Sequence, residues 1–158
     1  METNEHFPLL DATRAFLAKP KQMLIGAEWC DAASCRRLDV VNPADGSVLA
    51  HVPEADEHDV QQAIAAARRA FDAGPWRSAK TTDRERLLLA LADLIDANAR
   101  ELAEIESLDN GKPVTVAQGL DVAMAAQCFR YMAGWATKIE GSVIDAGMPY
   151  MPDSEIFT

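Results

Sequence analysis

Three cysteines are the residues of this chain best suited to act as a nucleophile, and they lie at Cys30, Cys35 and Cys128. A catalytic thiol needs a nearby base or cation that lowers its pKa. Cys128 lies between Gln127 and Phe129 in an amphipathic stretch, and Cys30 and Cys35 flank a polar turn that shows no catalytic base. The set is odd in number and has no CxxC pair, so neither a disulfide framework nor a zinc site is predicted. We expect free thiols and no catalytic residue.

Histidines and paired carboxylates do not suggest catalysis either. The histidines are scattered, at His6, His51 and His58. The pairs Glu101/Glu104 and Glu104/Glu106 fall in a helical region, where solvated surface charge is expected. The sequence contains no GxGxxG, GxxxxGK[ST], HExxH or GxSxG motif. We therefore expect no cofactor-binding residue in this chain.

The composition indicates a folded acidic protein. Hydrophobic residues make up 49% of the 158 residues and charged residues 25%, which is enough to bury a core. Nucleic acid is excluded as an expected partner, because the net charge is -10 and phosphate binding needs clustered Lys and Arg. No stretch has the length and apolarity expected of a membrane helix, and the first residues, METNEHFPLL, lack the pattern of a secretory signal. We expect a cytoplasmic protein.

The elements that would position a site begin with an N-terminal arm, residues 1–21. Apolar spacing up to Leu17 predicts a short helix, which Pro20 ends. Residues 22–29 predict one short strand that is interrupted at Gly26. Two further strand-like runs, 38–41 and 48–52, flank the turn sequence NPADGS and predict a β-hairpin.

From residue 56 the apolar spacing becomes that of helices. Asp56 is expected to cap a helix that ends at Gly74, before Pro75. Thr82 and Glu85 predict a capping box at the start of the next helix.

The apolar stripe of that second helix is interrupted at Asn98, so two helices or one kinked helix are both possible before a stop at Gly111. Pro113 suits the first turn of a further helix that extends to about residue 138. We expect these helices to share a core that includes Phe71, Leu91, Leu94 and Tyr131.

The order of arm, hairpin, helices and extended tail predicts an α/β fold that is part of a larger domain. A parallel sheet would need further strand–helix–strand units, and the sequence supplies none. The tail, residues 141–158, ends in an apolar run that has the pattern of a strand cut in mid-course. Its apolar residues are expected to lack a partner strand: Val143, Met148, Tyr150 and Ile156.

Four segments carry a family resemblance. They are VVNPADG (40–46), AFDAGPW (70–76), ESLDNGKP (106–113) and RYMAGWA (130–136). In order and spacing they resemble the N-terminal region of the aldehyde dehydrogenase superfamily, over residues 22–158. Residues 16–23 look most like bacterial enzymes of the phenylacetaldehyde type. Cys35 departs from the small or polar turn residue of relatives, which puts the geometry of that turn in doubt.

The resemblance implies an NAD(P)-dependent parent enzyme that oxidises an aldehyde to a carboxylic acid through a cysteine-bound hemithioacetal and thioester. The implied fold is the N-terminal part of the aldehyde dehydrogenase fold, in which a strand hairpin and helices flank a Rossmann-like domain. The arm would comprise residues 1–21, the first part of the NAD(P)-binding domain residues 22–140, and the start of an oligomerisation hairpin residues 141–158. In the family the catalytic and cofactor residues follow later, so none is expected here. NAD or NADP would bind the parent and not this chain alone.

One family site can be carried over by residue. Many relatives bind a monovalent cation through main-chain carbonyls before the Asn-Pro pair and a carboxylate of the LDNGKP segment, which correspond here to Val40, Val41 and Asp109. Oxygen ligands suit a hard cation. An equal alternative to the cation site is that Asp109 caps the helix end beside Asn110 and Gly111. We further expect its carboxylate to accept either the cation or main-chain amides near Asn42 and Pro43. A further ligand would lie beyond Thr158.

Two functions follow from these observations. The first is the N-terminal fragment of an aldehyde dehydrogenase, inactive by itself, whose parent is a homo-oligomer, a dimer or tetramer, joined through the 141–158 hairpin. The alternative is a non-catalytic interaction module that pairs with a full-length dehydrogenase, or with itself, by adding its tail as a strand.

Overall fold

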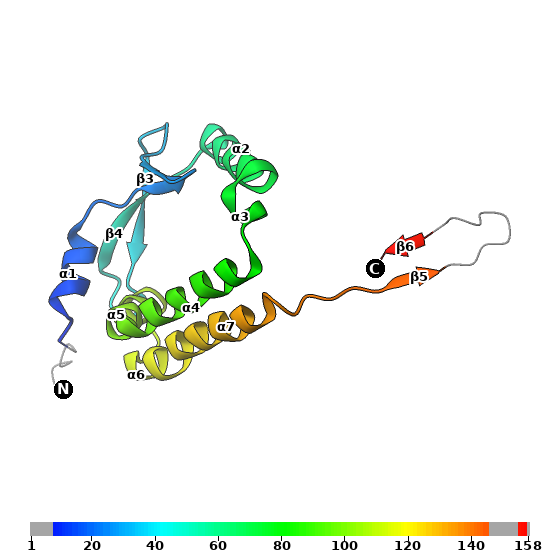
Figure 1. The fold of residues 1–158 in the computed structure, drawn as a ribbon. Coiled ribbons are helices and arrows are strands. Elements are labelled where there is room, and N and C mark those ends of the chain that lie inside the picture. The colour runs from blue at the N-terminus through cyan, green and yellow to red at the C-terminus, as the bar shows by residue number, and fades with distance from the viewer. Residues whose placement is uncertain (1–7, 146–154, 158) are drawn as a thin grey trace.

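A computed structural model describes residues 8–145 and 155–157. Figure 1 shows two short hairpins beside the N-terminal helix, a group of helices, and a C-terminal hairpin that projects away from them. Each sheet is a single antiparallel pair of strands. The mixed α/β content agrees with the fold class expected from the sequence, and no parallel pair occurs in the described ranges.

The N-terminal arm forms helix α1, Asp11–Ala18, as predicted. The next segment differs from prediction, because β1 (Met23–Ile25) and β2 (Glu28–Cys30) form a hairpin in place of one interrupted strand. Gly26 and Ala27 between them have φ of 63° and 78°. Two consecutive positive φ values fit the tight turns whose twist matches paired strands, so the residue that seemed to break a strand reverses the chain.

The predicted hairpin across NPADGS is confirmed as β3 (Arg37–Val41) and β4 (Val48–Pro53). Asn42 is buried, and its Oδ1 accepts the Ala44 amide at 3.0 Å. The register shifts between Val40 and Val41, so Leu49 is the extra residue of a bulge in β4.

Cys35, in the turn before β3, has a φ of 57°. This left-handed conformation is uncommon for residues other than glycine. The sequence departure noted at this position therefore coincides with an unusual backbone.

Helix α2 (Glu57–Ala73) begins and ends as predicted, with a capping box formed by Asp56 and Asp59. Helix α3 (Pro75–Ser78) was not predicted. The Thr82 capping box is wrong: α4 spans Thr81–Ala97, its N-cap is Lys80, and no side chain caps it. Thr82 lies inside the first turn, two positions beyond the N-cap.

The interruption at Asn98 separates two helices, because α5 spans Ala99–Asn110. The Asn98 Nδ2 donates to the Leu94 carbonyl at 2.8 Å and closes the end of α4. The helical run predicted after Pro113 exists as three successive elements: α6 (Val114–Val116), the π-helical segment η1 (Ala117–Val122) and α7 (Ala123–Trp135). Helices α4 and α7 lie side by side and run in opposite directions (Figure 1).

The core is built from small residues, which contradicts the predicted core. The buried apolar side chains are Ala32, Ala92, Ala103, Ala117, Val122, Ala126 and Ala133. The four residues expected inside are exposed, by 36% at Leu91, 61% at Leu94, 67% at Phe71 and 63% at Tyr131. The helices meet mainly through alanines, Ile95 and Val114 pack partly against this core, and many of the other large apolar side chains are exposed.

The tail also departs from prediction. Strand β5 (Val143–Asp145) pairs with β6 (Glu155–Phe157), with Ile144 opposite Ile156, so the tail supplies its own partner strand. Met148 and Tyr150, which were expected in the same segment, lie outside the described residues.

Candidate functional site

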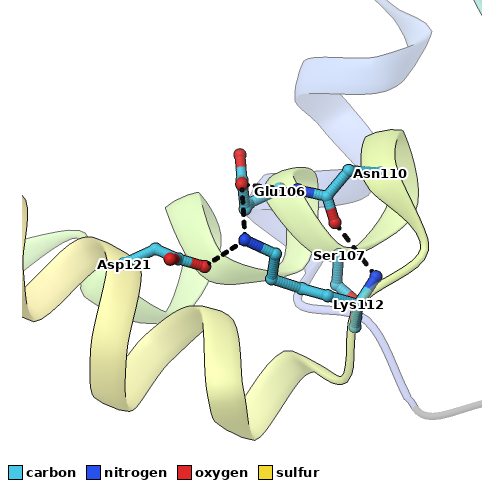
Figure 2. A network of polar contacts seen from close by, with 5 residues as sticks. All are labelled: Glu106, Ser107, Asn110, Lys112 and Asp121. Carbon is cyan, nitrogen blue, oxygen red and sulfur yellow. Dashed lines mark hydrogen bonds and ion pairs between the residues drawn. The ribbon is translucent and has the colours of Figure 1, made fainter.

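The LDNGKP segment turns the chain at the end of α5 (Figure 2). Gly111 adopts a left-handed φ of 80°, and its amide donates to the Ser107 carbonyl at 2.9 Å. The Ser107 Oγ then donates to the Lys112 carbonyl at 2.6 Å, while the Lys112 amide donates to Asn110 Oδ1 at 3.0 Å. These contacts satisfy groups that a helix end leaves open, so the segment forms a defined turn.

The Lys112 ammonium joins this turn to the following helical segment (Figure 2). Its Nζ lies 2.5 Å from Asp121 Oδ2 and 3.3 Å from Glu106 Oε1. The hydrogen bond to Asp121 is the main reason that the pKa of Lys112 is raised, and Glu106 adds to it. Lys112 is thus held as a cation that links α5 to η1.

The same turn packs on the NPADGS hairpin. A side-chain carbon added to Gly111 would come within 3.0 Å of Pro43 Cγ. That distance is below the usual separation of packed carbon atoms. Glycine at 111 therefore meets two requirements, a left-handed backbone and close contact with the hairpin.

A cavity of about 540 Å³ lies between the arm, the two hairpins and α5. Val40 and Asp109 both line it, whereas Val41 is not among its lining residues. Its apolar walls come mainly from Phe16, Leu17, Trp29, Leu49, Ile105 and Leu108. The structure thus brings together two of the three residues of the expected cation site.

Asp109 itself is exposed, and in the described part of the chain no hydrogen bond to its carboxylate is found. The expectation that it accepts amides near Asn42 is wrong, because the Asn42 amide donates to the Ser47 carbonyl at 2.8 Å and the Ala44 amide to Asn42. Asn110, and not Asp109, accepts the amide just beyond the helix end. The cation role of Asp109 stays a prediction.

Sequence reasoning missed a fully buried carboxylate. Glu104 was expected on a solvated surface, but its side chain is fully buried. Its Oε2 accepts from Thr13 Oγ1 at 2.6 Å and from the Leu10 amide at 2.9 Å, and its Oε1 accepts from Arg100 Nε at 2.8 Å. Burial alone would raise the pKa of Glu104, but the hydrogen bonds from Thr13, Leu10 and Arg100 outweigh it and lower that pKa.

This carboxylate positions the arm, because two of its three donors belong to the arm segment. One sequence signal could have located it. Glu104 precedes the apolar Leu108 by four residues, which places both on the same face of α5. A carboxylate on the apolar face of a helix is usually buried with partners.

The candidate nucleophiles have no activating partner in the described ranges. Cys35 and Cys128 are exposed and Cys30 is half-buried. His51 Nδ1 lies 2.7 Å from Asp39 Oδ1 on the exposed face of the β3–β4 hairpin. In the described ranges, His51 makes no hydrogen bond to a cysteine. His58 contacts Gln62, and His6 lies outside the described residues. Within those residues, no three His, Cys, Asp or Glu side chains gather as a metal site.

A Rossmann-type site places the phosphates at helix N-termini that follow parallel strands. The sheets in the described ranges are antiparallel pairs. That this chain contributes no cofactor-binding residue stays a prediction. Of the described helices, none has the length and apolar character required to cross a membrane.

Comparison with known proteins gives consistent results. Residues 29–157 match the sequence model of the aldehyde dehydrogenase family. The chain is 43% identical over 150 residues to phenylacetaldehyde dehydrogenase of Pseudomonas fluorescens, which covers 95% of this chain and 29% of that protein. It is 47% identical over 124 residues to mitochondrial aldehyde dehydrogenase of Sus scrofa, covering 78% and 24% of the two chains.

A solved structure shares the same arrangement. The NAD+ complex of aldehyde dehydrogenase from Bacillus cereus superposes with a TM-score of 0.83 at 43% identity, over 87% of this chain and 28% of that one. The chain therefore spans less than a third of the length of these relatives.

Proposed function

This chain belongs to the aldehyde dehydrogenase family, and from that premise we propose that it is the N-terminal portion of an NAD(P)-dependent enzyme that oxidises an aldehyde to a carboxylic acid. The observation that carries the proposal is the match over residues 29–157 together with the 0.83 TM-score. Arylacetaldehydes are the proposed substrate class, which the 43% identity to phenylacetaldehyde dehydrogenase supports. The proposed compartment is the cytoplasm.

Within that enzyme we assign this portion a structural role and no catalytic or cofactor-binding residue. Residues 1–21 form the arm, residues 22–140 the first part of the cofactor-binding domain, and residues 141–158 the start of an oligomerisation hairpin. The Glu104 contacts support the first boundary, because they anchor the arm to α5. The β5–β6 pair supports the last.

A chimera tests this proposal. The 150 residues of the Pseudomonas fluorescens enzyme that match this chain are replaced by the chain, and NADH formation with phenylacetaldehyde is measured. We expect an active, folded chimera. A chimera that folds, is soluble and lacks aldehyde oxidation, while the unmodified enzyme is active in parallel, would contradict the proposal.

The 158-residue chain alone provides the complementary measurement. We expect it to form no NADH with any aldehyde and to show no NAD+ binding by calorimetry. Cys128→Ala is the matched variant, since Cys128 is exposed. Turnover that persists through repurification and is lost in Cys128→Ala would show that this chain carries its own chemistry.

The cation site at Val40, Val41 and Asp109 is a second proposal for the same enzyme. Its support is that Val40 and Asp109 line one cavity beside a bulge in the β3–β4 ladder. In the chimera, Na+ or K+ should raise the unfolding temperature more than choline at equal ionic strength. Asp109→Asn should abolish that difference and Asp72→Asn, at an exposed position of α2, should not. Equal unfolding temperatures in all three salts would exclude the site.

Assembly into a homodimer or homotetramer is proposed for the whole enzyme through the projecting β5–β6 hairpin (Figure 1). The same hairpin keeps the second candidate function open, an interaction module that adds a strand to another dehydrogenase or to itself. Light scattering on the chain with and without residues 142–158 tests whether the hairpin mediates self-association. Self-association that depends on these residues supports both uses of the hairpin, and a monomer in both cases contradicts them.

A further inference from the structure

The most unusual physical feature of this chain is the distribution of its large apolar side chains. The two largest fully buried side chains are Glu104 and Thr13, which are both polar. Many large apolar residues are exposed instead, among them Ile64 on α2 and Trp135 on α7. Proteins that stand alone rarely leave contiguous apolar surface of this kind open.

The exposed side chains form stripes on individual helices. On α7, Met124, Tyr131 and Trp135 fall within about 40° of one another at 100° per residue, and all three are exposed. The buried residues of the same helix, Ala126 and Ala133, lie on the opposite side, toward α4. The stripe therefore faces directly away from the helix that α7 contacts.

Helix α2 repeats this arrangement. Val60, Ile64 and Phe71 fall within about 40° of arc and are exposed by 48%, 56% and 67%. The main element contacts of α2 are with α3 and β1, and the three side chains of this stripe remain exposed. A helix with an apolar stripe normally buries it against a neighbour.

The length of the relatives indicates what covers these faces. The chain spans 29% of the Pseudomonas fluorescens enzyme and 28% of the Bacillus cereus enzyme, and its fold superposes on the corresponding part of the latter. In such an enzyme, more than two thirds of the chain lies outside this portion and is available to cover these faces.

We infer that the α2 stripe (Val60, Ile64, Phe71) and the α7 stripe (Met124, Tyr131, Trp135) are the docking faces for the remaining portion of the aldehyde dehydrogenase chain. The inference rests on the proposed function and adds to it which surfaces join the two portions. It also explains why the helices of this chain meet through alanines. Alanines allow the helices to approach closely on one face, and the larger apolar side chains on the opposite face then pack against the remaining portion.

The test places the same substitution in two settings, the 158-residue chain alone and the active chimera. Ile64→Asp and Tyr131→Asp add a charge to each stripe. In the chain alone both positions are exposed, so the unfolding temperature should change by no more than about 1 °C. In the chimera the charge would be buried, and the unfolding temperature should fall by at least about 3 °C.

Matched controls are available on both helices. Gln62→Asp adds the same charge to α2 on the side opposite the stripe, where Gln62 is exposed. Tyr131→Phe retains the ring on α7. Neither should lower the unfolding temperature of the chimera by more than about 1 °C.

Each outcome decides the inference. Asp variants that behave like the controls in an active chimera overturn it and leave the proposed function standing. An inactive chimera counts against the proposed function first, and against the inference with it. A dimer of the 158-residue chain that Ile64→Asp and Tyr131→Asp dissociate, without any effect of either variant in the chimera, would make a second copy the occupant and overturn the inference.

Discussion

The α1–α5 contact and the α4–α7 contact hold helices together by opposite means. Between α1 and α5, one buried carboxylate, Glu104, accepts hydrogen bonds from Thr13 and Leu10. Between α4 and α7, the buried residues are alanines, and the charge contact found there in the described ranges, from Arg130 to Asp93 and Asp96, lies at the exposed rim. The first contact depends on hydrogen bonds to a few polar atoms, whereas the second depends on the small volume of the alanine side chains between the helices. They should therefore fail under different substitutions.

Removing the carboxylate should produce the largest effect. Glu104→Ala removes the acceptor of the Thr13 hydroxyl and the Leu10 amide, and the carboxylate that Arg100 Nε contacts. Breaking a buried charged contact from one side costs about 3–5 kcal/mol. We expect a loss of that size in the free energy of urea unfolding. Glu101→Ala, a nearby carboxylate without such partners, should change it by no more than about 0.5 kcal/mol, and equal losses for the two variants would contradict the role of Glu104.

Enlarging the alanine contact should have the next largest effect. Ala133 is fully buried on α7, so Ala133→Leu forces a larger side chain into closely packed helices. Overpacking of this kind costs about 1–3 kcal/mol. Ala125→Leu, at an exposed position of the same helix, is the control and should be nearly neutral. If Ala133→Leu is as stable as the control by urea unfolding, then the size of the side chain at position 133 does not limit the packing of α7 on α4.

The two contacts also show what the sequence could predict. The Asp56 cap and the end of α2 at Gly74 were predicted correctly, because each depends on residues a few positions apart. Glu104 was misread because its partners Leu10 and Thr13 are 94 and 91 residues away. Apolar periodicity located the stripes on the helices, but it does not indicate whether the surface that covers each stripe lies within these 158 residues. That is why Leu94 and Tyr131 were placed in a core and are exposed.

The candidate site shows the same division. The tight turn of LDNGKP follows from Gly111, whose left-handed backbone is a local property. The approach of Pro43 to Gly111 and the shared cavity of Val40 and Asp109 depend on tertiary packing. The family resemblance supplied the Val40 and Asp109 pairing, which local rules could not.

Acid should weaken the polar contact selectively. The pKa of Glu104 is lowered in the folded chain, so its contribution to stability is complete above the ordinary glutamate value of 4.5 and is lost as the pH falls through the lowered value. The difference in urea midpoint between wild type and Glu104→Gln should be largest at neutral pH and should narrow below pH 4.5. The other carboxylates are common to both proteins and cancel. A difference that is constant from pH 7 to the acid limit would contradict this assignment.

The smallest effect is expected at an apolar residue of the alanine-packed pair. Leu94 is 61% exposed on α4, although its place in the apolar stripe would assign it to a core. A buried leucine replaced by alanine costs about 2–5 kcal/mol, but an exposed one loses little contact and gains slightly in helix propensity. We therefore expect Leu94→Ala to change the free energy of urea unfolding of the isolated chain by less than about 0.5 kcal/mol. Leu88→Ala, at a half-buried position of the same helix, should cost more, because more of its contact surface is already covered. A loss above about 2 kcal/mol at Leu94 would show that the isolated chain covers this stripe itself. The contrast between the alanine contact and the open apolar faces would then no longer hold.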